Sequence, residues 1–110
     1  MSSSATSEPY TVAYLCNRKF VVFDPSRRWP TEAGGVYVFA RPAPGSTWIP
    51  LYVGQTRNLA NRLAKHEKWS EAERYGATHI HVREVPHPAR RSALESDLIE
   101  SFRPLLLNTR

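Results

Sequence analysis

GVYVF (residues 35–39), LYVGQT (51–56) and RNLANRLAKH (57–66) follow one another in the first two thirds of this chain. The first two segments are rich in β-branched and aromatic residues, which favour β-strands, and each contains one tyrosine. Side chains alternate between the two faces of a strand, so antiparallel pairing of these segments could bring Tyr37 and Tyr52 onto one face. The third segment has the apolar spacing of a helix. We therefore predict two tyrosine-bearing strands followed directly by a helix.

The predicted helix places two cationic or titratable side chains beside the sheet. Asn58 is a good N-cap, and Leu59 and Leu63 belong to the apolar arc at about 100° per residue. Arg62 and His66 then lie one turn apart on the edge of that arc. Both side chains could reach a group held beside the sheet. Two phenols, a guanidinium and an imidazole suit a phosphodiester better than a core.

The residues before this region predict a tail and a hairpin. Residues 1–9 are Ser-rich and have no apolar pattern, which is typical of a disordered tail. Residues 10–33 are interpreted as an N-terminal hairpin and linker, with Asn17 and Arg18 between the two strands. The hairpin either extends or covers the sheet, or forms an arm that contacts substrate. The second alternative follows from the positive and aromatic residues Arg18, Lys19, Arg27, Arg28 and Trp29.

Four more elements are predicted after Phe39. Residues 41–50 contain three prolines and are interpreted as a long loop. Residues 70–76 predict a short helix with a Ser-x-x-Glu capping box and a terminal glycine. Residues 78–85 alternate as a third strand, with two histidines expected at its surface. Residues 89–102 predict the last helix.

The last helix contains a carboxylate in an unusual position. With Leu94 at zero and about 100° per residue, Leu98 lies near 40°, Ile99 near 140° and Glu95 near 100°. Glu95 is therefore expected inside the apolar arc, where a charge is costly unless a cation or hydrogen-bond donors meet it. A single carboxylate can bind Mg²⁺ when water and phosphate supply the other ligands.

Composition sets the broad class. The 110 residues suit one domain, and 41% hydrophobic with 23% charged residues is typical of a globular protein. The net charge of +5 is compatible with nucleic acid. Cys16 has no second cysteine to pair with and is expected in a strand. Neither a membrane span nor a secretion signal is evident, so we expect a cytoplasmic location.

These motifs together resemble the GIY-YIG nuclease domain. GVY, then YVG, then an arginine and a histidine, then Glu95, and finally Asn108 occur in the family's order over about residues 34–108. The resemblance implies an α/β fold in which a small antiparallel sheet is flanked by three helices. Residues 34–110 would be this nuclease domain, to which the N-terminal hairpin is added.

The resemblance also implies an activity, metal-dependent endonucleolytic cleavage or nicking of DNA, with Mg²⁺ or Mn²⁺ as cofactor. Tyr37 would be the base and Tyr52 would position water or phosphate. Glu95 would bind the metal and Asn108 would be a structural or positioning residue. The remaining positions implied for catalysis are Arg62 and His66. The residues expected to contact nucleic acid are Gln55, Arg57, Arg62 and Lys65.

Two features depart from the family pattern. Gln55 stands where many members have lysine, and the interval between the tyrosine motifs is longer than usual. One alternative is therefore a nucleic-acid-binding member with little or no activity. Another is a protein-interaction domain that uses its tryptophan-bearing loops, although core or loop anchoring is the expectation for most of Trp29, Trp48 and Trp69. DNA specificity would come from loops, from the hairpin or from a partner protein.

Overall fold

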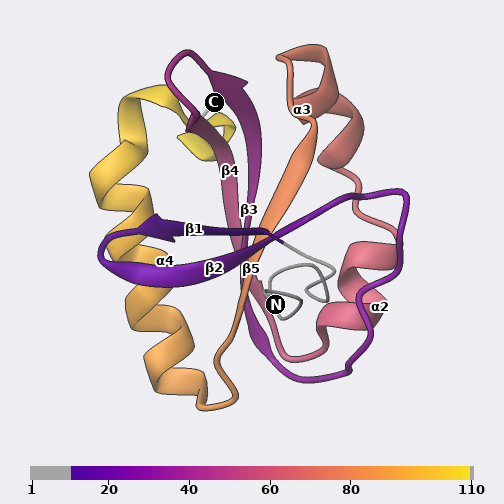
Figure 1. Cartoon of the computed structure of the whole chain (residues 1–110). Coiled ribbons are helices and arrows are strands. Elements are labelled where there is room, and N and C mark those ends of the chain that lie inside the picture. The colour runs from indigo at the N-terminus through magenta and orange to yellow at the C-terminus, as the bar shows by residue number, and fades with distance from the viewer. Residues whose placement is uncertain (1–10, 110) are drawn as a thin grey trace, which may run out of the picture.

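The protein has a mixed α/β fold built on one curled antiparallel sheet. The computed structural model describes residues 11–109, and the tail predicted for residues 1–9 lies outside that range. The sheet has five strands in the order β1-β2-β5-β3-β4. In Figure 1 helix α4 lies on one side of the strands and helices α2 and α3 on the other, while the β1–β2 hairpin crosses the other strands steeply.

The strands are β1 (Thr11–Leu15), β2 (Arg18–Phe23), β3 (Gly35–Ala43), β4 (Thr47–Thr56) and β5 (His79–Glu84). The helices of the described range are α2 (Leu59–Ala64), α3 (Trp69–Arg74), α4 (Pro88–Phe102) and the short 3₁₀ turns η1 (Arg103–Leu105) and η2 (Leu107–Thr109). The predicted antiparallel sheet with flanking helices is thus confirmed. None of these helices is both long enough and apolar enough to cross a membrane.

The N-terminal hairpin extends the sheet. Strand β2 pairs with β5, for example through Val22 and His81, so the first of the two predicted roles is confirmed. The turn lies one residue earlier than predicted. Cys16 and Asn17 have φ values of 50° and 62°, and this left-handed pair matches the twist of the two flanking strands. Cys16 is therefore a turn residue and not the strand residue that its composition suggested.

The long loop predicted over residues 41–50 is wrong, because β3 and β4 continue as a hairpin through most of that stretch. Pro42 pairs with Trp48 of β4 but lies beyond the last β3–β5 pair, at Ala40, so on its other side there is no strand that would need its missing N–H. Pro50 lies on β4, the edge strand of the sheet. A bulge at Leu51 shifts the register between the Phe39–Tyr52 and Ala40–Pro50 pairs.

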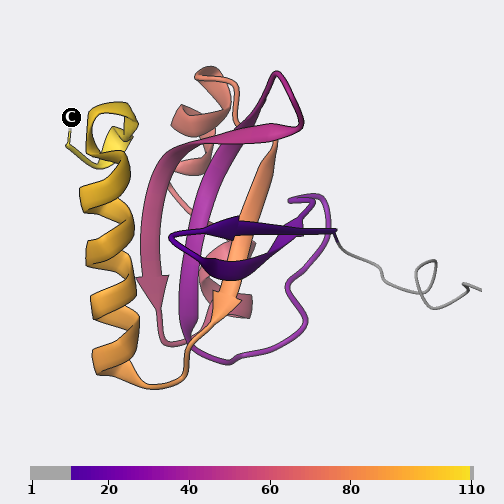
Figure 2. The ribbon, with the colours of Figure 1, turned by 60° about the vertical axis from the view of Figure 1, so that its left-hand side comes forward.

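Alternation along β3 divides the core into two apolar clusters. Tyr37 and Phe39 belong to the cluster that contains Leu59 of α2 and Ala72 of α3. Val36 and Val38 belong to the cluster on the opposite face, which contains buried side chains of α4. Figure 2 shows α4 running along the β4 side of the sheet. The predicted two faces of β3 are confirmed, and they separate the α2–α3 side from the α4 side.

The helices differ from their predictions mainly at their ends. The Asn58 side chain accepts a hydrogen bond from Asn61 N, which confirms the predicted cap of α2. Helix α2 ends at Ala64 because Lys65 is extended, so His66 lies outside the helix and not one turn after Arg62. Helix α3 starts at Trp69 without a side-chain cap, so the predicted capping box is wrong.

His81 is a buried histidine, not the strand-surface residue that its spacing suggested. Its side chain is 0% exposed, on the α4 face of β5, and its ring packs edge-on against Trp48 with 4.9 Å between centroids. Neither ring nitrogen has a hydrogen-bond partner among residues 11–109. Burial lowers the pKa of His81 to about 4. The folded protein therefore resists a proton that the unfolded chain accepts readily.

His81→Leu should remove a loss of stability in acid. Because the folded pKa is below the unfolded value, the parent is destabilised as the pH falls below about 6.5, by roughly 2 kcal/mol from about pH 7 to about pH 5. Urea unfolding at several pH values measures this slope. The leucine variant should no longer lose this stability between about pH 7 and about pH 5, and near neutral pH it should be at least as stable as the parent. His79→Gln changes a half-exposed neighbour and should lose stability in acid as the parent does. A slope unchanged in His81→Leu would contradict the prediction.

Candidate active site

The two predicted tyrosines lie on the same face of the sheet, the α2–α3 face. Tyr37 pairs with Gly54 across β3 and β4, and Phe39 pairs with Tyr52. The tyrosine rings are 6.5 Å apart between centroids and inclined by 30°. A side chain at residue 54 would overlap the Tyr37 ring and hydroxyl, so glycine is required there. The group that requires glycine at residue 54 is therefore the Tyr37 side chain.

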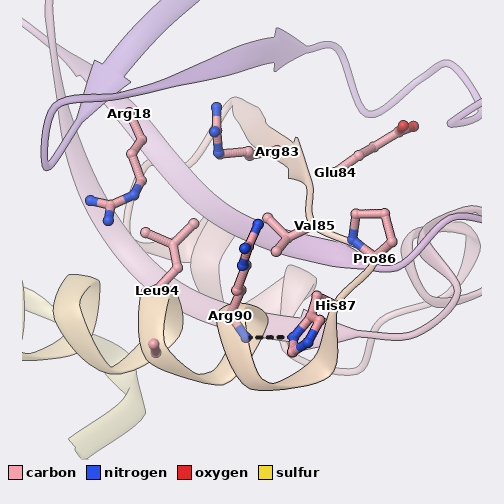
Figure 3. A pocket seen from close by; sticks show the side chains of 9 residues that line it. Arg18, Arg83, Glu84, Val85, Pro86, His87, Arg90 and Leu94 are labelled. Atoms are coloured by element: carbon pink, nitrogen blue, oxygen red, sulfur yellow. Dashed lines mark hydrogen bonds between the residues drawn. The ribbon is translucent and has the colours of Figure 1, made fainter.

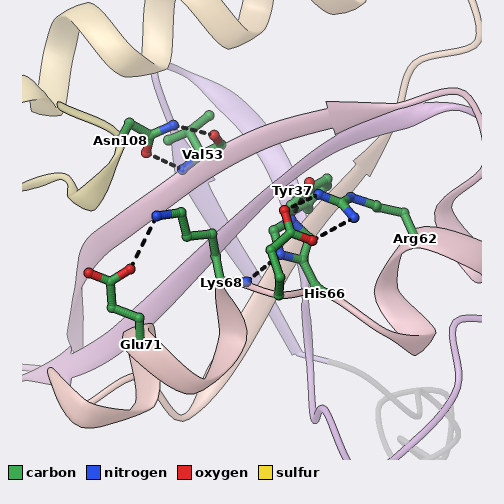
Figure 4. Close-up of polar contacts among 8 residues, drawn as sticks. Tyr37, Val53, Arg62, His66, Lys68, Glu71 and Asn108 are labelled. Atoms are coloured by element: carbon green, nitrogen blue, oxygen red, sulfur yellow. Dashed lines mark hydrogen bonds and ion pairs between the residues drawn. The ribbon is translucent and has the colours of Figure 1, made fainter. Parts of the chain in front are cut away.

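The Tyr37 hydroxyl forms a hydrogen bond with His66 (Figure 4). Its oxygen is 2.8 Å from His66 Nε2, and the backbone N–H of Lys68 donates to His66 Nδ1 over 3.0 Å. A ring nitrogen that accepts from a backbone N–H has no proton, so the neutral ring must have its proton on Nε2. We assign His66 Nε2–H as the donor and the Tyr37 oxygen as the acceptor. The end of α2 creates this contact because it turns the chain so that residue 66 faces the sheet.

Burial keeps His66 neutral. Desolvation, together with the positive charges of Arg62 and Lys68, lowers the pKa of His66 to about 4. The imidazole is therefore uncharged near neutral pH and keeps its donating N–H toward Tyr37.

Burial also keeps Tyr37 protonated in the free protein. Desolvation raises the pKa of Tyr37 to about 12, and the Arg62 guanidinium beside the hydroxyl opposes that rise. The pKa of Tyr52 is raised as well, again mainly by burial. The positive charge of Arg62 thus favours the phenolate, but burial outweighs it. Removal of the Tyr37 proton would leave a phenolate that faces one N–H donor and one cation.

Arg62 is held by a carboxylate that sequence reasoning missed. Arg62 Nη1 and Nη2 donate to Glu67 Oε1 and Oε2, both over 3.0 Å. The hydrogen bonds from Arg62 lower the pKa of Glu67 to about 2. Side chains five residues apart do not pair on one helix. Glu67 reaches Arg62 only because helix α2 ends before Lys65 and the chain turns back. Glu67 therefore occupies the planar fork that a phosphate would need.

Glu95 lies at the edge of the sheet, on the flank of α4. Its carboxylate accepts a hydrogen bond from Gln55 Nε2 over 3.1 Å. The side chain is half-buried, whereas Leu94 and Leu98 are buried, so Glu95 borders the apolar arc and does not lie within it. Burial is the main cause of the raised pKa of Tyr52, and the Glu95 charge adds to it across the edge strand β4. The carboxylate is thus within electrostatic range of the tyrosine site, although α4 packs on the opposite face.

Arg91 is a buried cation that sequence reasoning also missed. It is 8% exposed, and its guanidinium donates to Gln55 Oε1 over 3.2 Å and to the carbonyl oxygens of Val85 and Pro86 over 3.3 and 3.1 Å. On the helical wheel it lies near 60° from Leu94, closer to the centre of the apolar arc than Glu95, and that angle could have revealed it. Gln55 thus connects the guanidinium of Arg91 to the carboxylate that was expected to bind metal.

Asn108 binds backbone. Its Nδ2 donates to Val53 O over 2.7 Å, and its Oδ1 accepts from Val53 N over 2.9 Å. Val53 belongs to β4, the edge strand, so these bonds serve groups that have no neighbouring strand. Asn108 therefore fixes the strand that holds Tyr52, which agrees with a structural or positioning role.

The other predicted contacts are peripheral. Arg57 and Lys65 are exposed at the two ends of α2. Trp29 is buried, Trp69 packs on Phe39, and Trp48 packs on His79 and His81, so the three indoles anchor the fold.

Metal ligation within residues 11–109 would depend on few protein groups. No cluster of three or more His, Cys, Asp or Glu side chains occurs there. Glu95 nevertheless presents a half-buried carboxylate whose Oε1 is oriented by Gln55. Such a group fits an ion that keeps most of its ligands as water or substrate oxygen.

Comparison with known proteins gives no neighbour. Searches against protein-family models, curated proteins and solved structures found no match.

Glu67→Gln should tighten binding of a DNA duplex measured in EDTA. A phosphate that uses the Arg62 fork must first displace the Glu67 carboxylate, and an exposed ion pair contributes little, so affinity should rise by about fivefold at most. Glu71→Gln removes the same charge from a Lys68 pair and is the matched control. Equal gains in the two variants would mean that only net charge has changed.

Proposed function

We propose that the chain is a metal-dependent endonuclease that cleaves or nicks DNA with a GIY-YIG type of site. The observation that carries the proposal is the position of the Tyr37 hydroxyl, bonded to His66 Nε2 over 2.8 Å and flanked by the Arg62 guanidinium. Tyr52 lies beside it on the same sheet face, and the Glu95 charge reaches Tyr52. A buried packing tyrosine needs a hydrogen-bond partner for its hydroxyl, but it needs neither a guanidinium nor a second tyrosine beside it.

Tyr37 is proposed as the general base. Its phenolate would take a proton from the attacking water, whose oxygen then bonds to phosphorus while the bond to the leaving sugar oxygen breaks. The neutral His66 donates a hydrogen bond to the phenolate oxygen, and Arg62 supplies a positive charge beside it. With a pKa of about 12, only a small fraction of Tyr37 is deprotonated near neutral pH. The rate is therefore expected to depend steeply on pH.

Arg62 is proposed to move from Glu67 to the scissile phosphate. Its planar fork forms two parallel hydrogen bonds to a carboxylate, and the same geometry suits two phosphate oxygens. Glu67 is exposed, so the exchange exposes no buried charge. The ion pair therefore keeps the fork ordered until substrate arrives.

Glu95 is proposed to hold Mg²⁺ or Mn²⁺, with DNA phosphate and water as the other ligands. When bound, the ion would supply Lewis-acid polarisation of the phosphoryl oxygens. Gln55 keeps one Glu95 oxygen oriented by its hydrogen bond, and Ser92 accepts a second bond from the same amide over 3.0 Å. Tyr52 would position water or phosphate between this carboxylate and Tyr37.

A second candidate is a DNA-binding member of the fold with little activity. Two observations favour it. Gln55 is already engaged with Arg91 and Glu95 and offers no cation to substrate, and burial raises the pKa of the proposed base to about 12. Plasmid nicking with Mg²⁺, and its loss in EDTA, separates the two functions. Binding without nicking would favour the second.

Glu95→Gln should abolish nicking and keep the fold. The glutamine oxygen can still accept from Gln55, but a neutral amide is a poor ligand for a hard divalent cation. Plasmid relaxation should fall to background in Mg²⁺ and in Mn²⁺. Independently, Mn²⁺ should broaden the backbone amide signals around residue 95 in the parent and not in the variant.

The matched control is Glu100→Gln, further along α4, where an exposed carboxylate binds Arg103 over 2.8 Å. It should nick at the parent rate. Parent-like nicking by Glu95→Gln would show that the metal assignment is wrong.

Tyr37→Phe and Tyr52→Phe should differ in pH dependence. Because the active form of Tyr37 is the phenolate and its pKa is about 12, the parent rate should rise by about tenfold per pH unit from neutral pH upward. Tyr37→Phe keeps the ring and its packing but removes this rise and nearly all activity. Tyr52→Phe should retain a reduced rate with the same slope, since water can replace part of a positioning hydrogen bond.

Single-turnover nicking rates across this pH range provide the measurement, and Tyr14→Phe, on an exposed residue of β1, is the control. A rising limb that persists in Tyr37→Phe would exclude Tyr37 as the base.

A further inference from the structure

A hollow of about 450 Å³ lies on the α4 side of the sheet, away from the tyrosines. It is bounded by the start of β2, the end of β5 and the first turns of α4 (Figure 3). We call it the arginine hollow, after the three guanidinium groups around it. They belong to Arg18, Arg83 and Arg90.

The three arginines come from three different elements and have no acidic partner in the described part of the chain. Arg18 Nη1 donates to Cys16 O and Arg83 Nη1 donates to Lys19 O, each over 3.1 Å. No ion pair involves Arg18, Arg83 or Arg90 among residues 11–109. A guanidinium has five N–H donors, so these backbone contacts leave donors available for an anion.

The acid that borders the hollow does not neutralise it. Glu84 Oε2 accepts hydrogen bonds from Trp29 Nε1 over 3.2 Å and from Thr31 Oγ1 over 2.5 Å. Figure 3 shows its carboxylate pointing away from the arginines. The first turn of α4 contains no acidic residue either. The hollow therefore has an excess of positive charge that no neighbouring carboxylate balances.

We propose that the arginine hollow binds a phosphate group of a nucleic-acid strand at a point distinct from the scissile phosphate. The inference rests on the proposed function and deepens it. Arginine is the side chain best suited to phosphate oxygens, and three of them surround one space. Val85, Pro86 and Leu94 form an apolar wall against which a sugar or base can pack.

The position of the hollow separates binding from cleavage. Arg83 pairs with Val36 on β3, and Val36 faces α4, whereas Tyr37 faces α2 and α3. A phosphate at Arg83 thus leaves the tyrosine face free. The hollow should contribute affinity and the salt dependence of binding, and leave the rate of the bound complex unchanged.

The test compares two variants that lose the same charge. The first, Arg18→Gln/Arg83→Gln/Arg90→Gln, empties the hollow of guanidinium groups. The second, Arg27→Gln/Arg28→Gln/Arg74→Gln, removes three exposed arginines that do not line it. Affinity for a short fluorescent duplex is measured in EDTA over a range of salt concentrations. EDTA makes the result independent of whether the chain cleaves DNA.

The hollow variant should bind the duplex at least about tenfold more weakly, and its log–log salt slope should be shallower by about 1 to 2. The matched variant should lose less than about threefold, since scattered exposed charges are screened at physiological salt. Equal losses in both variants, or none in the first, would overturn the proposal. A failure of nicking with these binding results intact would overturn only the proposed function.

Two further arms complete the test. The single variant Arg90→Gln alters an exposed helix position, so it should fold normally and still lose part of the affinity. Its result replaces that of the triple variant if the latter does not fold. Titration with deoxyadenosine monophosphate, followed by the arginine Nε–Hε signals, distinguishes a strand from a free nucleotide. Saturation by the mononucleotide at concentrations as low as the duplex requires would overturn the strand assignment.

Discussion

The arrangement of the α2–α3 face depends on one buried hydroxyl, that of Tyr37. Placing a phenol at 2% exposure in an apolar cluster is unfavourable unless its oxygen has a partner, and His66 supplies that partner over 2.8 Å. The histidine can do so only because α2 ends at Ala64 and the Lys68 N–H then fixes the ring from its other side. Gly54 leaves the space that the hydroxyl fills. The end of helix α2, the position of the proton on His66 and the glycine at residue 54 thus all accommodate the Tyr37 oxygen.

The edge strand β4 is the second constraint on the site, because its outer backbone groups and the side chain of Gln55 bind residues that follow or belong to α4. Asn108 pairs with both backbone groups of Val53, and Gln55 connects Arg91 to Glu95 at the same edge. The amide of Gln55 satisfies a buried guanidinium and orients a carboxylate at once. A lysine at residue 55 could not accept a hydrogen bond from Arg91, and its positive charge would pair with Glu95. Glutamine accepts from Arg91 and donates to Glu95 without neutralising the carboxylate.

The identity of the central strands and the faces of their side chains were predictable from the sequence. Contacts that depend on where a helix or strand ends were not. Alternation placed Tyr37 and Tyr52 together correctly, because the bulge at Leu51 lies outside the segment in which Tyr37 pairs with Gly54 and Phe39 with Tyr52. Helical periodicity failed at His66, because it assumes a helix that continues, and with it the Glu67 contact was invisible. The continuation of β3 and β4 through residues 41–50 was missed because proline signals a loop unless an unpaired strand edge is available to tolerate it, and sheet order does not follow from local sequence. The carboxylate of Glu95 was found but placed too deep in the core, since the helical wheel gives an angle and no depth.

Two buried aromatic side chains with ionisable groups show how differently the faces are used. His81 and Tyr37 are both shifted toward their neutral forms by the same physical cause, the loss of water. His81 has no described hydrogen-bond partner, so its burial only lowers stability in acid. Tyr37 instead has a neutral donor and a cation arranged around the oxygen that would gain charge. Such preorganisation does not outweigh the effect of burial on the pKa of Tyr37 in the free protein, but it would leave little reorganisation if charge developed there, which is the condition under which electrostatic catalysis is strongest.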